Sequence, residues 1–241
     1  MSTQNLLFQR QYKINDSISI TIPTVGEILA DEDAYYGLVS VLTAMPIDLM
    51  VQLDDAGIDF TKINEYELFL MMFSEIKSPE VDTSLVFGGL NLSKFEMAVN
   101  EQNGNVVLFN KENGGIVIDR AIHGQIADVL RKIHHLEKNV RKPANDEARK
   151  FMIKRARDKM RRNKNRKFDS QLESLIVAMV NTEQYKYDFE GTRELSIYQF
   201  NESVRQIIKK VDYDNRMFGV YTGTISAKDL SQDELNWLIH K

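Results

Sequence analysis

Hydrophobic residues recur at three- and four-residue steps through most of the first 80 residues, which predicts helices. Residues 25–76 show this spacing, and Pro46 interrupts it between two predicted helices. Asn64 and Glu67 form a capping-box pattern ahead of a third helix, whose apolar body is typical of a core centre. Residues 11–22 alternate in part and are rich in isoleucine, which predicts one edge strand.

The hydrophobic spacing changes to two residues between about 94 and 119, where short strands are expected. Asn103-Gly104 is a turn dipeptide that favours positive φ, and Asn113-Gly114-Gly115 supplies a second turn. We therefore expect a three-stranded antiparallel meander in this segment.

Helical spacing returns at about Ala121 and continues in separate stretches toward the C-terminus. A long helix is expected to open at Thr192, and Gly219 is expected in a loop that follows it. Two further capping-box patterns predict helix starts, Ser170 with Glu173 and Ser231 with Glu234.

Together these elements predict an α+β fold that is mostly helical. Residues 1–137 are expected to form an N-terminal helical lobe that carries the meander. Residues 138–168 are expected to form a basic helical connector, and residues 169–241 a C-terminal helical lobe.

Composition narrows the chemistry of the protein. The chain has no cysteine, which excludes disulfides, thiolate metal sites and cysteine nucleophiles. Its N-terminus lacks the apolar region of a signal peptide, and no apolar run reaches the roughly 18–20 residues that span a bilayer. We therefore expect a cytoplasmic protein without membrane attachment.

No residue pattern indicates catalysis. Phosphate-binding and dinucleotide-binding glycine motifs are missing, and the four histidines are too few and too scattered to favour a triad or a metal site. The histidines are expected at the surface or its boundary. Asp31-Glu32-Asp33 lies between two helical stretches, where acids serve as helix caps. We expect a non-enzymatic protein with no catalytic residue, metal or cofactor.

The charge of the chain is unevenly distributed. Residues 138–167 contain 14 Lys or Arg and three acids, or about +11, although the whole chain carries −4. The remainder therefore carries about −15. Such asymmetry indicates a charged partner.

A basic helix is expected from Asn145 or Asp146 to about Arg162. Its apolar stripe is thin, so most of the helix is expected to face outward. Phe151, Met152, Ala156 and Met160 are its main apolar members. The candidate binding surface consists of its cations: Arg149, Lys150, Lys154, Arg155, Arg157, Lys159, Arg161, Arg162, Lys164, Arg166 and Lys167.

Three interpretations of this basic surface stay open. It can be a solvated helix face, a docking site for an acidic protein surface, or a phosphate-contacting site for nucleic acid. The acidic remainder of the chain argues against nucleic acid, and so does the lack of a stacking aromatic, because Phe151 is expected in the core.

Residues 20–69 and 197–238 resemble small proteins from the tail-structure modules of phages and prophages of Gram-positive bacteria, similar to tail assembly chaperones. The first stretch reads ITIPTVGEILADEDAYYGLVSVLTAMPIDLMVQLDDAGIDFTKINEYELF, and the second reads IYQFNESVRQIIKKVDYDNRMFGVYTGTISAKDLSQDELNWL. The resemblance covers neither the meander nor the basic helix, and it transfers no catalytic residue.

This resemblance implies a non-enzymatic protein of tail assembly or tail structure, in the bacterial host cytoplasm or the virion tail. It implies phage tail proteins as partners, the tape-measure protein or another tail component, and leaves oligomer formation open. The alternative function is that of a nucleic-acid-binding accessory protein using residues 141–167.

Overall fold

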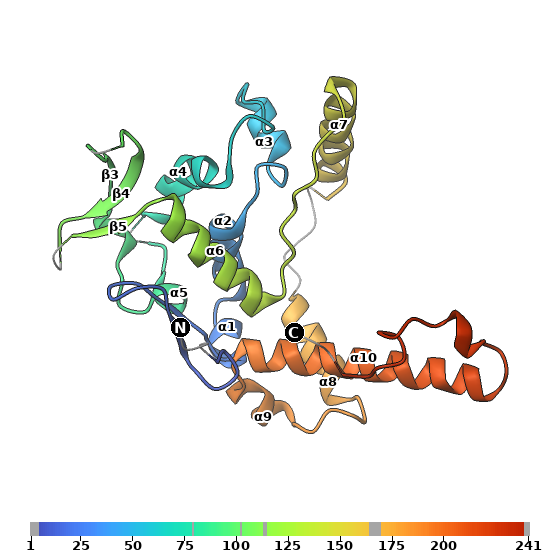
Figure 1. The fold of residues 1–241 in the computed structure, drawn as a ribbon. Coiled ribbons are helices and arrows are strands. Elements are labelled where there is room, and N and C mark those ends of the chain that lie inside the picture. The colour runs from blue at the N-terminus through green and yellow to red at the C-terminus, as the bar shows by residue number, and fades with distance from the viewer. Residues whose placement is uncertain (1–4, 79, 102, 113–114, 164–169, 239–241) are drawn as a thin grey trace.

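The computed structural model describes residues 5–238, except 79, 102, 113–114 and 164–169 (Figure 1). The described chain is mostly helical and has two small antiparallel sheets, so the expected α+β class is confirmed. The long helices are α2 (Glu32–Thr43), α4 (Glu65–Ile76), α6 (Arg120–His134), α7 (Asp146–Asn163), α8 (Gln171–Val180) and α10 (Ile197–Tyr221). The short helices are α1 (Val25–Leu29), α3 (Met50–Asp55), α5 (Ser84–Phe87) and α9 (Phe189–Glu194).

The first sheet is a hairpin of β1 (Gln11–Lys13) and β2 (Ser19–Thr21), so the single strand expected there is wrong. The Asn15 side chain makes the turn by accepting hydrogen bonds from the backbone N–H groups of Ser17 (2.9 Å) and Ile18 (2.8 Å). A short polar side chain that satisfies the backbone in this way favours a turn over a continuous strand.

The second sheet contains β3 (Glu96–Val99), β4 (Val106–Asn110) and β5 (Ile116–Ile118) in that order, each antiparallel to its neighbour. The expected meander is therefore confirmed. Leu108 in the central strand lies opposite Ile118, and both are buried against the helices.

The main hydrophobic core includes side chains from residues 1–137 and from residues 169–241. The two segments also share backbone hydrogen bonds, from Val25 N–H to the Leu195 carbonyl (2.9 Å) and from Ile197 N–H to the Pro23 carbonyl (2.8 Å). The start of the chain and the base of α10 therefore lie side by side. The boundaries of the predicted lobes stay a prediction.

Two expectations for the C-terminal half are wrong. Thr192 does not open the long helix, because it lies inside α9 and α10 begins after Ser196. The Ser196 side chain accepts a hydrogen bond from Gln199 N–H (3.2 Å), and the Gln199 side chain accepts one from Ser196 N–H (2.9 Å). The capping box of Ser196 and Gln199 fixes the helix start five residues later than expected. Gly219 lies within α10 and not in a loop.

Ser231 and Glu234 also form their predicted reciprocal contacts, but a helix does not follow. Ser231 N–H donates to the Glu234 carboxylate (2.9 Å), and Glu234 N–H donates to the Ser231 hydroxyl (3.3 Å). The described residues after them, as far as 238, form a turn and an extended stretch.

Candidate interaction surfaces

Helix α7 lies beside α3 and away from α10 (Figure 1). Asn145 caps it, as one of the two expected caps, by accepting a hydrogen bond from Ala148 N–H (2.8 Å). Ile153 is 4% exposed and joins Leu53 and Phe60 in a small second core. One buried side chain and its neighbours therefore hold an 18-residue helix, and most of that helix faces outward.

Two of the predicted surface cations pair with carboxylates of the protein itself. The Arg157 guanidinium lies 3.0 Å from Asp54 and also pairs with Asp55, and hydrogen bonds to these carboxylates raise its pKa. Arg149 lies 3.7 Å from Asp59. These pairs attach α7 to α3 and to the loop after it, and they remove two cations from the predicted surface.

Two further cations have carboxylate neighbours on α7 itself. Lys150 pairs with Asp146 (2.9 Å), and Arg161 lies 3.9 Å from Asp158. Exposed pairs of this kind are weak and leave the side chains accessible.

Four predicted cations are exposed and have no carboxylate partner within the described residues: Lys154, Arg155, Lys159 and Arg162. Lys164, Arg166 and Lys167 lie outside the described residues.

Phe151 is not a core residue, contrary to the expectation from its spacing. It is 60% exposed, and the Arg155 guanidinium carbon lies 5.8 Å from its ring centroid. The core position belongs to Ile153 instead, because α3 crosses α7 on that side. The basic helix therefore presents an aromatic ring near cations that have no carboxylate partner where the structure describes the chain.

A second surface is formed by the C-terminal arm, which we define as residues 208–238. The first turns of α10 are buried, with Ile197 and Phe200 fully enclosed. Beyond Val204 the helix extends from the molecule, and the C-terminal segment runs back beside it (Figure 1).

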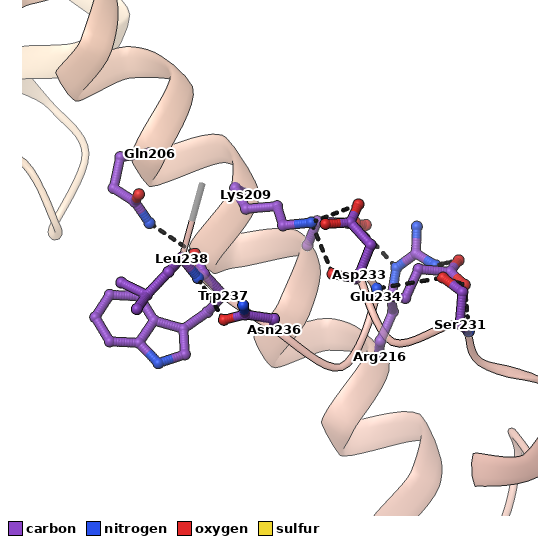
Figure 2. Close-up of polar contacts among 10 residues, drawn as sticks. Gln206, Lys209, Arg216, Ser231, Asp233, Glu234, Asn236, Trp237 and Leu238 are labelled. Carbon is purple, nitrogen blue, oxygen red and sulfur yellow. Dashed lines mark hydrogen bonds and ion pairs between the residues drawn. The ribbon is translucent and has the colours of Figure 1, made fainter. Parts of the chain in front are cut away.

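Side chains of α10 hold the returning segment (Figure 2). Gln206 donates to the Trp237 carbonyl (2.7 Å), and Lys209 donates to the backbone carbonyl of Asp233 (2.9 Å). Arg216 pairs with Glu234, whose pKa is lowered to about 2, mainly by hydrogen bonds from Ser231.

Gly219 permits the close approach of the returning chain. Its carbonyl accepts hydrogen bonds from the N–H groups of Thr224 (2.9 Å) and Ile225 (3.0 Å). A Cβ at this position would lie 2.7 Å from the Ile225 Cδ1 atom. The reversal at the tip of the arm therefore uses a residue without a side chain.

The C-terminal arm carries exposed apolar side chains. Phe218 is 70% exposed and Tyr221 is 86% exposed, although both belong to a well-formed helix. The other large exposed apolar residues of the arm are Ile208, Val211, Leu235, Trp237 and Leu238.

Most charged groups of the arm pair with one another. Lys210 pairs with Asp214 (2.6 Å), Arg216 pairs with Asp212 (2.9 Å), and Lys209 pairs with Asp233 (3.2 Å). The arm therefore exposes apolar side chains, and most of its charges are compensated, unlike those of the outward face of α7.

A hollow of about 740 Å³ lies between α4, β4 and the start of α6. Three carboxylates line it. Glu67 and Asp119 accept hydrogen bonds from N–H groups at helix starts, from Asn64 (2.8 Å) and Ile122 (2.9 Å), and Asp128 pairs with an arginine (3.1 Å). Each carboxylate therefore has a structural contact.

One histidine lies deeper than expected, and a second lies at the boundary of the core. His123 is 1% exposed, and its ring stacks on Phe69 with centroids 4.2 Å apart. His134 contacts the Tyr35 hydroxyl through Nε2 (2.9 Å). Burial lowers the pKa of both histidines to about 4.

Over the described part of the chain, no group of three or more His, Cys, Asp or Glu side chains is arranged to hold a metal ion. Within the same residues, no helix combines the length and apolar character needed to cross a membrane.

Residues 162–240 match a family model described as the YomV second domain, from a family derived from phages and prophages. The matched stretch is about a third of the chain and includes α8, α9, α10 and the whole C-terminal arm. Comparison with curated proteins and with solved structures gave no match. The family match is consistent with a phage protein.

Proposed function

We propose that this protein is a non-enzymatic phage protein that acts through protein–protein contact in tail assembly or in the assembled tail. The contact surface is the C-terminal arm, and the partner is the tape-measure protein or another helical tail component. The carrying observation is the exposure of Phe218 and Tyr221 on a projecting helix within the phage-associated stretch.

The chemistry of the arm favours a helical partner. Four of its exposed apolar side chains lie on a regular helix, so they suit a groove or a second helix with a complementary apolar face. Because most charges of the arm are paired, they add little long-range attraction. Association through the arm is therefore expected to depend weakly on salt.

The test is co-expression with tail proteins encoded by neighbouring genes, followed by affinity measurement on the purified partners. Phe218→Asp combined with Tyr221→Asp is expected to weaken binding at least about thirtyfold, because large aromatic residues dominate such interfaces. Phe8→Asp combined with Phe189→Asp is the matched control, since both residues are exposed aromatics outside the arm.

The melting temperature of both double variants should match that of the unmodified protein, because all four side chains are at least half exposed. Equal binding by the arm variant and the control variant would exclude the arm as the contact surface. A chain that binds no tail protein and is also missing from purified tails would refute the proposed function.

A further inference from the structure

We propose that the outward face of α7 is a binding site for single-stranded nucleic acid, in which Phe151 stacks on a base and four neighbouring cations contact phosphates. This inference is independent of the proposed function, because it concerns another helix and another kind of partner. The four cations are those without a carboxylate partner among the described residues: Lys154, Arg155, Lys159 and Arg162.

The arrangement of α7 supports this site in two ways. First, carboxylates of α3 and of the loop after it pair with Arg149 and Arg157 on the inner side of the helix, and the four outer cations have no carboxylate partner in the described part of the chain. Second, Arg155, Lys159 and Arg162 follow Phe151 at steps of four, four and three residues. Residues so spaced lie near one another on one helix face.

Phe151 favours nucleic acid over an acidic protein surface. An exposed phenyl ring in a basic environment offers a flat face to an unstacked base, and sequence-independent proteins use such stacking. The Arg155 guanidinium near this ring adds a second planar group. An acidic peptide would contact only the cations, whereas a nucleic acid would also use the Phe151 ring. The exposed ring therefore favours nucleic acid as the partner.

The experiment measures fluorescence anisotropy of a labelled oligodeoxythymidine and of a duplex of equal length at several salt concentrations. Four phosphate contacts predict a slope of about −3 for the logarithm of the association constant against that of salt. Arg155→Glu combined with Lys159→Glu should make that slope shallower by about 1.4, or abolish binding. Lys186→Glu combined with Lys228→Glu changes the net charge equally away from α7 and should leave the slope unchanged.

Phe151→Ala is expected to weaken oligodeoxythymidine binding roughly five- to hundredfold, and Phe151→Trp is expected to restore it. Phe8→Ala is the matched aromatic control. Circular dichroism of each variant should show unchanged helix content, because Phe151 is outside both cores.

Three outcomes would overturn the proposal. One is absence of binding at about 50 mM salt, where phosphate contacts are strong. Another is equal affinity of Phe151→Ala and the unmodified protein. The third is displacement of the oligonucleotide by polyglutamate at equal charge concentration, which would identify an acidic protein as the partner instead.

Discussion

Glu32 is a buried carboxylate at the start of α2 that receives two hydrogen bonds from the start of α8. The Ser170 hydroxyl donates one, and Leu172 N–H donates the other (3.2 Å). Ser170 in turn accepts from Glu173 N–H (2.8 Å). One side chain therefore completes the cap of a helix that lies 138 residues away in sequence.

Glu32→Ala is expected to destabilise the protein by about 1–3 kcal/mol, because it leaves a buried N–H donor without its acceptor. Urea unfolding followed by circular dichroism measures this change. Asp33→Ala is the matched control, because Asp33 is exposed on the same turn and its loss should cost little. A similar loss for both variants would contradict the role given to Glu32.

The hydrogen bonds of single side chains are predictable where the bonded residue is close in sequence. Asp31 was expected to cap a helix, and it accepts a hydrogen bond from Ala34 N–H (3.4 Å). The contacts of Glu32 could not be predicted, because no local pattern records a distant residue. Phe151 was misplaced for a related reason, since the direction from which α3 packs decides which side of α7 is buried.

At the scale of secondary structure elements, Arg131 connects three helices. It is buried in α6, pairs with Glu65 of α4, and donates to the carbonyl of Thr43 at the end of α2 (2.6 Å). Lys138 also pairs with Glu65, and hydrogen bonds to the two cations lower the pKa of that carboxyl despite its burial.

Arg131→Met is expected to cost about 1–3 kcal/mol, because it removes one of the two cationic partners of Glu65 and leaves the Thr43 carbonyl without its donor. Adding Glu65→Leu is expected to restore most of the loss, since an apolar pair can replace a buried ion pair. Chemical denaturation of the two variants measures both effects. A double variant as unstable as the single variant would show that the hydrogen bond to Thr43 is the larger contribution.

Helix starts were predictable where hydrophobic spacing and a cap agreed. The Asn64 and Glu67 capping box forms as expected, with Glu67 N–H 3.1 Å from the Asn64 side chain. The start of α10 was misplaced because apolar spacing continues across residues 195–196, although Ser196 and Gln199 carry the same signal. The sequence predicts a loop at Gly219, because the close contact of Gly219 with Ile225 depends on where the returning segment packs.

At the scale of the whole molecule, the lowered pKa values of two histidines predict how stability depends on pH. The pKa of His123 and of His134 is about 4 in the folded protein and about 6.5 in the unfolded chain. Below about pH 6.5 the unfolded chain binds protons that the folded protein does not, so stability falls as pH falls toward 4. At pH 5 the loss is roughly 2 kcal/mol for each histidine.

Urea unfolding at pH 7 and pH 5 measures this loss. His123→Phe is expected to roughly halve it, because the ring on Phe69 is kept and the titratable group is removed. An unchanged pH dependence in this variant would contradict the assignment to His123.

The fold class of the molecule was predictable, but the packing of its distant segments against one another was not. Helical spacing, turn dipeptides and the meander follow from neighbouring residues, and the structure confirms them. The packing of β2 and α1 against the base of α10 depends on contacts between opposite ends of the chain. Such contacts leave no periodic signal in one sequence.

Helix α10 is buried only near its base, and this has a mechanical consequence. From Phe200 to Tyr221 it extends about 31 Å at a rise of about 1.5 Å per residue. The helix therefore acts as a lever, in which a rotation of about 10° at the base moves the tip by roughly 5.5 Å. A small adjustment of the packing around Phe200 would reposition Phe218 and Tyr221 relative to a partner while the helix itself stays intact.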